Sequence, residues 1–194
     1  MILNEKEAEE FLEQQGFGVI QRHFITNENQ IKTIKLPLPW VMKASGKKII
    51  HKRKLGGVKL NIKSLEQAKQ AFHKLEKIDS FEGAIIQPQI NGQEIILGLK
   101  DTEEFGIVIM VGAGGSCVEE KADVSFRVCP ITESDTEEMI KELKINIKNP
   151  SKVKNSLLQL SSLASRFPTI KEVDINPLFV NEQGAIVVDA RLVK

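Results

Sequence analysis

The chain has 194 residues and 41% hydrophobic content, enough apolar material for the core of one domain or of two joined lobes. Its 27 basic and 26 acidic residues give a formal charge of +1, so we expect neither a nucleic acid nor a membrane as partner. The longest apolar run, residues 107–111, is too short to span a bilayer and no signal-like segment opens the chain, so a cytoplasmic protein is expected.

The first half of the chain is predicted to contain two helices and three strands. A helix over residues 5–15 is expected to end before Gly16, a residue type that suits the position after a helix. A second helix, over residues 65–78, begins after Ser64, and Gln67 is predicted to complete a capping box there. Runs rich in Ile, Val and Phe predict strands over residues 40–43, 58–62 and 84–90.

The second half of the chain is predicted to alternate strand pairs with two helices. Apolar spacing predicts helices over residues 133–144 and 152–167, with Pro168 ending the second. Strands are predicted over residues 94–99, 107–111, 124–129, 172–180 and 185–192. The links within the first pair and the last pair are too short for a crossover helix, so both pairs must be antiparallel. This arrangement indicates an α+β fold class rather than a doubly wound parallel sheet.

Several common motifs are excluded. The glycines at 112, 114 and 115 do not complete a dinucleotide fingerprint, because Cys117 stands where the last glycine would be. No P-loop sequence occurs, and the three histidines are too scattered to indicate a metal cluster. Cys117 and Cys129 lack the spacing of a zinc site, so free thiols are expected.

One segment with chemical potential is the basic stretch that follows the first long strand. Lys43 ends this predicted strand, and six cationic or potentially cationic side chains fall within residues 47–54. The glycine pair Gly56-Gly57 then leads into the next strand. Ammonium groups and backbone N–H donors in such a loop could surround a polyphosphate. The alternative is a solvated basic loop with a hairpin glycine pair.

The second segment is the predicted hairpin over residues 172–192. A four-residue turn over residues 181–184 makes the numbers of paired residues sum to 365, so Asn176 faces Asp189 and Asp174 faces Arg191. An oxygen-only pair on neighbouring strands suits Mg²⁺, which completes its octahedron with water and phosphate. The alternative is an ordinary amphipathic hairpin with a surface ion pair between Asp174 and Arg191.

Read together, these two segments resemble opposite ends of the ATP-grasp domain found in ADP-forming acyl-CoA synthetases and, more distantly, in succinyl-CoA synthetase β subunits. Residues 87–98 (QPQINGQEIILG) are similar to the hinge and following strand of that family. Residues 101–106 and 112–130 resemble the next two segments, and the resemblance covers about residues 36–194. It implies a single ATP-grasp domain over residues 1–194, in which lobes 1–86 and 87–194 clasp the nucleotide about a hinge near residues 87–90.

The resemblance also implies roles for individual residues. Lys43 would contact the ATP phosphates, the glycine loop would cover them, the backbone near residue 88 would meet adenine, and Glu94 would bind the ribose hydroxyls. Asn176 and Asp189 match the magnesium ligands of the family. The residues implied to contact nucleotide are Lys43, Gly56, Gly57, Gln87, Pro88, Gln89, Glu94 and Arg127.

His51 matches a histidine that, in ADP-forming acetyl-CoA synthetases, accepts a phosphoryl group and carries it to ADP. A neutral imidazole is nucleophilic near pH 7, and the surrounding cations would stabilise the phosphate that it acquires. The chain lacks a recognisable CoA-binding domain, so the resemblance implies a CoA-binding α subunit as partner. The expected activity is that of an acid–CoA ligase (ADP-forming) that uses ATP or ADP and Mg²⁺.

One departure from the family pattern keeps a second function open. The family usually has an acid shortly after the histidine, whereas this chain has Lys54. If the acid activates the histidine, the chain would instead be a non-catalytic regulatory or nucleotide-sensing ATP-grasp module. A scaffold that no longer binds nucleotide is the third alternative.

Overall fold

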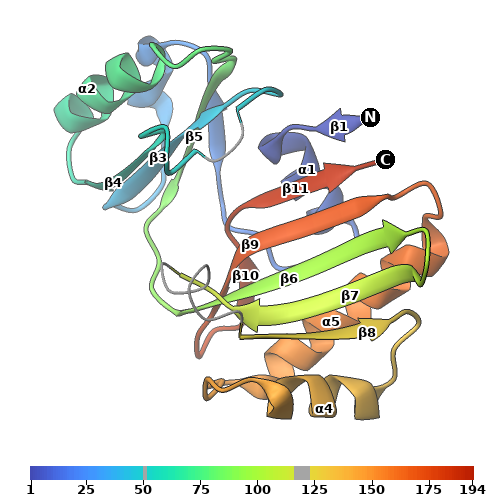
Figure 1. The fold of residues 1–194 in the computed structure, drawn as a ribbon. Coiled ribbons are helices and arrows are strands. Elements are labelled where there is room, and N and C mark those ends of the chain that lie inside the picture. The colour runs from blue at the N-terminus through green and yellow to red at the C-terminus, as the bar shows by residue number, and fades with distance from the viewer. Residues whose placement is uncertain (50–51, 116–122) are drawn as a thin grey trace. The chain divides into compact units, whose positions relative to one another are not determined.

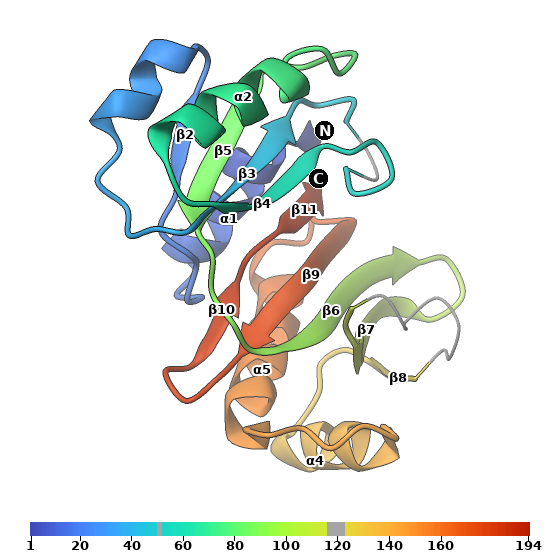
Figure 2. The same cartoon turned by 90° about the vertical axis from the view of Figure 1, so that its left-hand side faces the viewer.

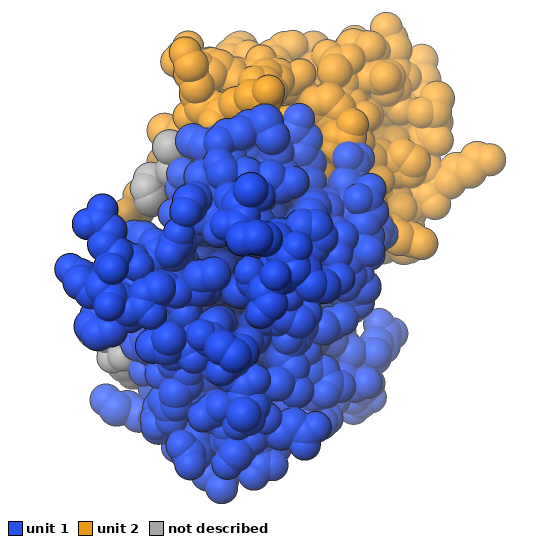
Figure 3. Space-filling view, turned by 90° about the vertical axis from the view of Figure 1, so that its right-hand side faces the viewer, with its two compact units in different colours: residues 1–3, 7–19, 91–194 blue, residues 4–6, 20–90 orange. Residues whose placement is uncertain are grey.

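The computed structural model describes residues 1–49, 52–115 and 123–194 (Figure 1). The chain divides into two compact units, which are coloured separately in Figure 3. Unit 1 comprises residues 1–3, 7–19 and 91–194, and unit 2 comprises residues 4–6 and 20–90. The chain therefore passes from unit 2 to unit 1 after residue 90, at the end of the segment predicted as a hinge.

Unit 2 contains a four-stranded antiparallel sheet with the order β2-β5-β3-β4 (Figure 2). Helix α2 (Leu65–Leu75) and the 3-10 helix η1 (Glu28–Thr33) bury apolar side chains against this sheet, including Phe72, Leu75 and Ile31. The strands are β2 (His23–Ile25), β3 (Trp40–Ser45), β4 (Val58–Ile62) and β5 (Gly83–Pro88).

Unit 1 contains a larger antiparallel sheet with the order β1-β11-β9-β6-β7-β8, and β10 also pairs with β9. Helix α5 (Pro150–Arg166) packs on one face of this sheet, behind β6 and β7 in Figure 1, and helix α4 (Glu133–Glu142) packs against α5 and β8. Helix α1 (Glu5–Gln14) adds Ala8 and Leu12 to the same core. The strands are β1 (Ile2–Leu3), β6 (Gln93–Thr102), β7 (Gly106–Ala113), β8 (Val124–Val128), β9 (Glu172–Val180), β10 (Ala185–Val187) and β11 (Ala190–Val193).

The predicted α+β class and the register of the last hairpin are confirmed. Every pair of β9 with β10 and β11 sums to 365, as in Val180 with Ala185 and Asp174 with Arg191. The prediction of one continuous strand over residues 185–192 is wrong, because β10 and β11 are separate. Pro177 has no N–H to donate to the facing strand, and the ladder is interrupted opposite it.

Three other predicted details are corrected. Ser64 caps α2 as expected, but the Gln67 side chain accepts a hydrogen bond from Lys63 N–H and does not complete a capping box. That helix ends at Leu75 rather than residue 78. Helix α4 ends at Glu142 rather than residue 144, because the Asp123 carboxylate accepts the backbone N–H groups of residues 144 and 145.

Strands β1 and β2 and the helix η1 were not predicted. The η1 start carries a complete capping box, in which Asn27 and Gln30 satisfy each other's backbone N–H groups. Within the described ranges, no helix is long and apolar enough to cross a membrane.

Candidate functional site

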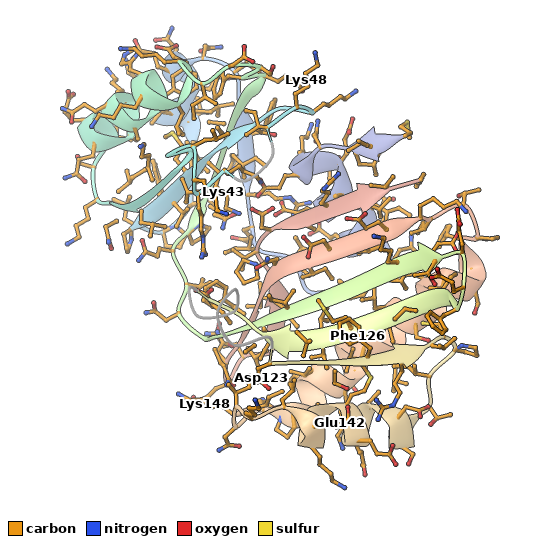
Figure 4. The ribbon with its side chains drawn as sticks, viewed as in Figure 1. Lys43, Lys48, Asp123, Phe126, Glu142 and Lys148 are labelled. Atoms are coloured by element: carbon orange, nitrogen blue, oxygen red, sulfur yellow. The ribbon has the colours of Figure 1, made fainter. Side chains whose placement is uncertain are left out.

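Lys43 is a buried cation in the middle of the unit 2 sheet. It lies on β3 between Val58 of β4 and Ile85 of β5, and only 4% of the residue is exposed (Figure 4). Burial of an ammonium requires a partner, because the charged form loses its hydration. That partner is Glu5, whose Oε1 accepts a hydrogen bond from Lys43 Nζ at 2.8 Å.

Glu5 joins a second lysine to the first. Its Oε2 atom accepts a hydrogen bond from Lys52 Nζ. Burial opposes ionisation of Glu5, but the charges of Lys43 and Lys52 outweigh this effect and lower the pKa of the carboxyl group. The Glu5 carboxylate therefore bridges the two lysines, one buried and one half-buried.

Backbone hydrogen bonds of the predicted glycine loop hold Lys52 close to strand β3, which carries Lys43. Gly57 N–H donates to the Lys52 carbonyl at 2.7 Å, and Ala44 N–H donates to the Gly57 carbonyl at 2.8 Å. Gly56 adopts a φ of +65°, which favours glycine, and a Cβ atom on Gly57 would lie 3.0 Å from the Lys52 carbonyl oxygen. The structure thus places Lys43 beside the turn at Gly56-Gly57, whereas His51 lies outside the described residues.

The segment predicted to contact adenine ends strand β5. Gln87 is 1% exposed, and its Oε1 atom has no hydrogen-bond partner among the residues that the structure describes. A buried acceptor in this state is uncommon and leaves a site for an external N–H donor. Pro88 is the last residue of β5, and Gln89 accepts a hydrogen bond from Asn61 N–H through its side chain at 2.8 Å.

In unit 1, Glu94 lies at the start of β6 against a glycine pair. Gly114 N–H donates to the Glu94 carbonyl at 2.8 Å, and a Cβ atom on Gly114 would lie 2.6 Å from the Glu94 carbonyl carbon. A Cβ atom on Gly115 would lie 3.6 Å from Glu94 Oε2. These two glycines let the β7 terminus approach Glu94, a packing role that a search for a dinucleotide motif did not detect.

The predicted metal ligands lie together on the last hairpin. Asn176 N–H donates to the Asp189 carbonyl at 3.1 Å, so the two residues face each other as the register predicted. Asn176 is exposed and Asp189 is half-buried. Their carboxylate and amide groups are the oxygen ligands that Mg²⁺ accepts.

Asp174, beside this pair, is a partly buried acid with other charged side chains around it. Burial, together with the charges of Asp189 and Glu172, raises the pKa of Asp174 to about 6 against the opposing effect of Arg191. The surface ion pair considered between Asp174 and Arg191 is not formed. Instead, Arg191 Nη1 lies 4.0 Å from Glu172 Oε1.

This donor set fits a magnesium ion that takes further ligands from a phosphate. In residues 1–49, 52–115 and 123–194, no group of three or more His, Cys, Asp or Glu side chains could hold a metal ion. Mg²⁺ is commonly bound through one or two protein oxygens plus water and substrate phosphates, so a closed cage of protein ligands is unnecessary.

Arg127 lies on β8, whereas Glu94, the other residue of unit 1 predicted to contact nucleotide, lies on β6. The cross-strand partner of Arg127 is Ile109 of β7. Its side chain contacts α4, where Nη2 lies 2.6 Å from Glu142 Oε1 and 3.3 Å from Glu138 Oε2. Glu142 also accepts a hydrogen bond from Ser125, and Figure 4 shows Glu142 on α4. Bonds from Arg127 and Ser125 lower the pKa of Glu142 to about 2. In this structure Arg127 joins β8 to α4.

A family model described as an ATP-grasp domain matches residues 1–193. The chain is 41% identical to acetate–CoA ligase (ADP-forming) II of Archaeoglobus fulgidus, a match that covers all of this chain and 30% of that protein. It is 37% identical to the beta subunit of acetate–CoA ligase (ADP-forming) I of Pyrococcus furiosus, over 98% of this chain and 91% of the subunit. The chain therefore spans less than a third of the Archaeoglobus protein.

Among solved structures, the chain is similar to acetyl-coenzyme A synthetase 1 of Ca. Korarchaeum cryptofilum in complex with coenzyme A and Ca-AMPCP. The TM-score is 0.91 at 31% identity, over 99% of this chain and 93% of that one. Another structure of that enzyme, with a TM-score of 0.81 at 31% identity over 97% of this chain and 91% of that one, contains Mg-AMPPCP. In it, a phosphohistidine segment points towards the nucleotide-binding site.

Proposed function

The chain belongs to the ATP-grasp domain family, and from this premise we propose that it is the nucleotide-binding part of an ADP-forming acyl-CoA synthetase. In this function it binds ATP or ADP with Mg²⁺ and exchanges a phosphoryl group with a histidine. The relatives named above are ADP-forming acetate–CoA ligases, and one solved relative holds a magnesium complex of an ATP analogue.

The observation that carries the proposal is the pairing of Asn176 with Asp189. Their backbones are joined across the hairpin, and the negative charge of Asp189 acts on the neighbouring carboxyl group of Asp174. A divalent cation at this place would offset that charge. When held by Asn176 and Asp189, Mg²⁺ would neutralise negative charge on the nucleotide phosphates.

Other residues of the chain are assigned to the nucleotide itself. Lys43 and Lys52 offer ammonium donors to phosphate oxygens, and the turn at Gly56-Gly57 holds Lys52 in place. Glu94 is assigned to the ribose hydroxyls. The buried Gln87 acceptor and the adjacent backbone of Pro88 and Gln89 are assigned to the adenine ring.

The histidine step rests on sequence, because His51 lies outside the described residues. In this step a neutral ring nitrogen of His51 attacks the γ-phosphorus of ATP. The N–P bond forms as the bond from that phosphorus to the β–γ bridging oxygen breaks, and ADP leaves. The reverse step makes ATP from ADP and the phosphohistidine.

A complete reaction requires a second protein or domain that binds CoA. The Pyrococcus relative is named as a beta subunit, and the Archaeoglobus relative is more than three times as long as the match. We assign to this chain the nucleotide half of the reaction ATP + carboxylic acid + CoA ⇌ ADP + phosphate + acyl-CoA, carried out with a CoA-binding α-type partner in the cytoplasm.

A regulatory or nucleotide-sensing module is the second candidate function. The observation that favours it is Lys54, a base where the family usually has an acid. Such a module would bind Mg-ATP without accepting a phosphoryl group. The two functions are therefore separated by covalent labelling rather than by binding.

The labelling experiment uses the chain together with a CoA-binding partner of verified activity, Mg²⁺ and ATP labelled at the γ-phosphate. The proposal predicts an acid-labile label on this chain that is lost in His51→Asn and retained in His73→Asn, which changes an exposed histidine on α2. Mg-ATP binding without any label would reject the catalytic function and support the regulatory one.

A further inference from the structure

Glu5 is a buried carboxylate that binds two lysines, which lie 38 and 47 residues after it in the sequence. Each carboxylate oxygen accepts a hydrogen bond from one of them, Oε1 from Lys43 and Oε2 from Lys52. The side chains of Glu5, Lys43 and Lys52 are 3%, 5% and 15% exposed, respectively. No motif that the sequence analysis singled out includes Glu5.

The opposite charges of this cluster stabilise one another inside the fold. Two ammonium groups held next to each other repel, and burial favours their neutral forms. Removal of one partner from a buried charged pair leaves an uncompensated charge, which is strongly unfavourable. Glu5 therefore offsets the positive charges of Lys43 and Lys52 inside the fold.

The cluster also fixes where the two positive charges lie. Lys43 is held by strand β3, and the Lys52 backbone is held by the turn at Gly57. The sequence from residue 51 to residue 54 is His-Lys-Arg-Lys and contains no acid, so Glu5 supplies a carboxylate to this segment from a remote part of the chain. An ammonium has three N–H donors, so a bond to Glu5 does not prevent a bond to a phosphate oxygen.

We propose that Glu5 is a positioning residue for nucleotide phosphates, which keeps Lys43 and Lys52 charged and adjacent so that both bind the polyphosphate of ATP. This role rests on the proposed function. Glu5 acts through the lysines and does not itself contact the nucleotide, because like charge separates a carboxylate from a phosphate. A purely structural role would instead affect all parts of the nucleotide equally.

The test compares ATP with adenosine, which lacks every phosphate. Mg-ATP affinity is measured by calorimetry, and adenosine affinity by competition with ATP, for the wild type and for Glu5→Gln and Glu5→Asp. The matched control is Glu10→Gln, which removes the same charge from an exposed position on the same helix. We expect Glu5→Gln to weaken ATP binding by about tenfold or more, the value of a charged hydrogen bond, with adenosine affinity unchanged.

Glu5→Asp keeps the charge but shortens the side chain, so its ATP affinity should fall between those of the wild type and Glu5→Gln. It carries the test if Glu5→Gln does not fold. Unchanged or tighter ATP binding, or an equal loss of adenosine affinity, would overturn the role of Glu5 while the proposed function stands. A wild-type chain that does not bind Mg-ATP would instead reject the proposed function.

Discussion

At the residue scale, the hairpin places Asn176 opposite Asp189, with Asp174 as a neighbouring acid. Neither Asn176 nor Asp189 is remarkable alone, because isolated polar residues on a sheet are usually solvated. Their register makes them a pair of oxygen donors on neighbouring strands. An Mg²⁺ ion bound there should depend on both side chains.

Asp189→Asn should raise the concentration of Mg²⁺ that is needed for ATP binding. The substitution preserves the size of the side chain but removes the charge, so apparent magnesium affinity in the presence of ATP should fall by at least roughly tenfold. Calorimetric titration of ATP over a series of Mg²⁺ concentrations measures this effect. Glu182→Gln, in the exposed turn of the same hairpin, is the control and should match the wild type. An unaltered magnesium dependence in Asp189→Asn would refute the assignment.

The sequence predicted some of these residues and not others for a physical reason. Asn176 and Asp189 are joined by a short turn, so strand alternation and turn length suffice to pair them. Glu5 is separated from Lys43 by 38 residues and from Lys52 by 47, and no local pattern encodes such a contact. The same holds for Arg127 and Glu142, which belong to different elements.

At the element scale, Arg127 and Glu142 connect strand β8 to helix α4. The sequence predicted both elements but assigned Arg127 to the nucleotide, because only the family resemblance addressed that position. In the structure Arg127 donates to Glu138 and Glu142 of α4. This connection should make the free energy of unfolding of unit 1 depend on pH.

Because folding lowers the pKa of Glu142 from 4.5 to about 2, its ionised form stabilises the folded state. This stabilisation is complete above about pH 4.5 and is lost as the pH falls towards 2. Glu142→Gln should therefore be less stable than the wild type at pH 7, and the difference should shrink across that window. Urea unfolding at a series of pH values measures it, with Glu103→Gln in the exposed β6–β7 turn as control. A difference that is constant with pH would contradict this account.

The boundaries of an element match the prediction where apolar spacing determines them. They differ from it where a single contact ends the element. Helix α5 and strand β9 lie close to their predicted ranges because each has a regular buried face. Strands β1 and β2 have two and three residues, which is too short for a pattern to emerge. The end of α4 is set by Asp123, which lies outside the helix.

At the scale of the whole molecule, the chain has an ATP-grasp fold built from two compact units, each with its own sheet and core. The family resemblance predicted this fold, whereas composition and periodicity alone reached only the α+β class. Unit 2 contains the cluster of Glu5, Lys43 and Lys52, and unit 1 contains Glu94 and the pair of Asn176 with Asp189. The nucleotide assignments in both units share one prediction, which is that the chain binds Mg-ATP.

Thermal unfolding of the wild-type chain with and without Mg-ATP tests this central claim most directly. A nucleotide at about 100 times its dissociation constant should add about 2.7 kcal/mol to the free energy of unfolding, which for a chain of this size raises the Tm by roughly 5–10 °C. The account predicts that shift with Mg-ATP and a much smaller one with Mg²⁺ alone. A Tm that does not change at millimolar Mg-ATP would contradict it.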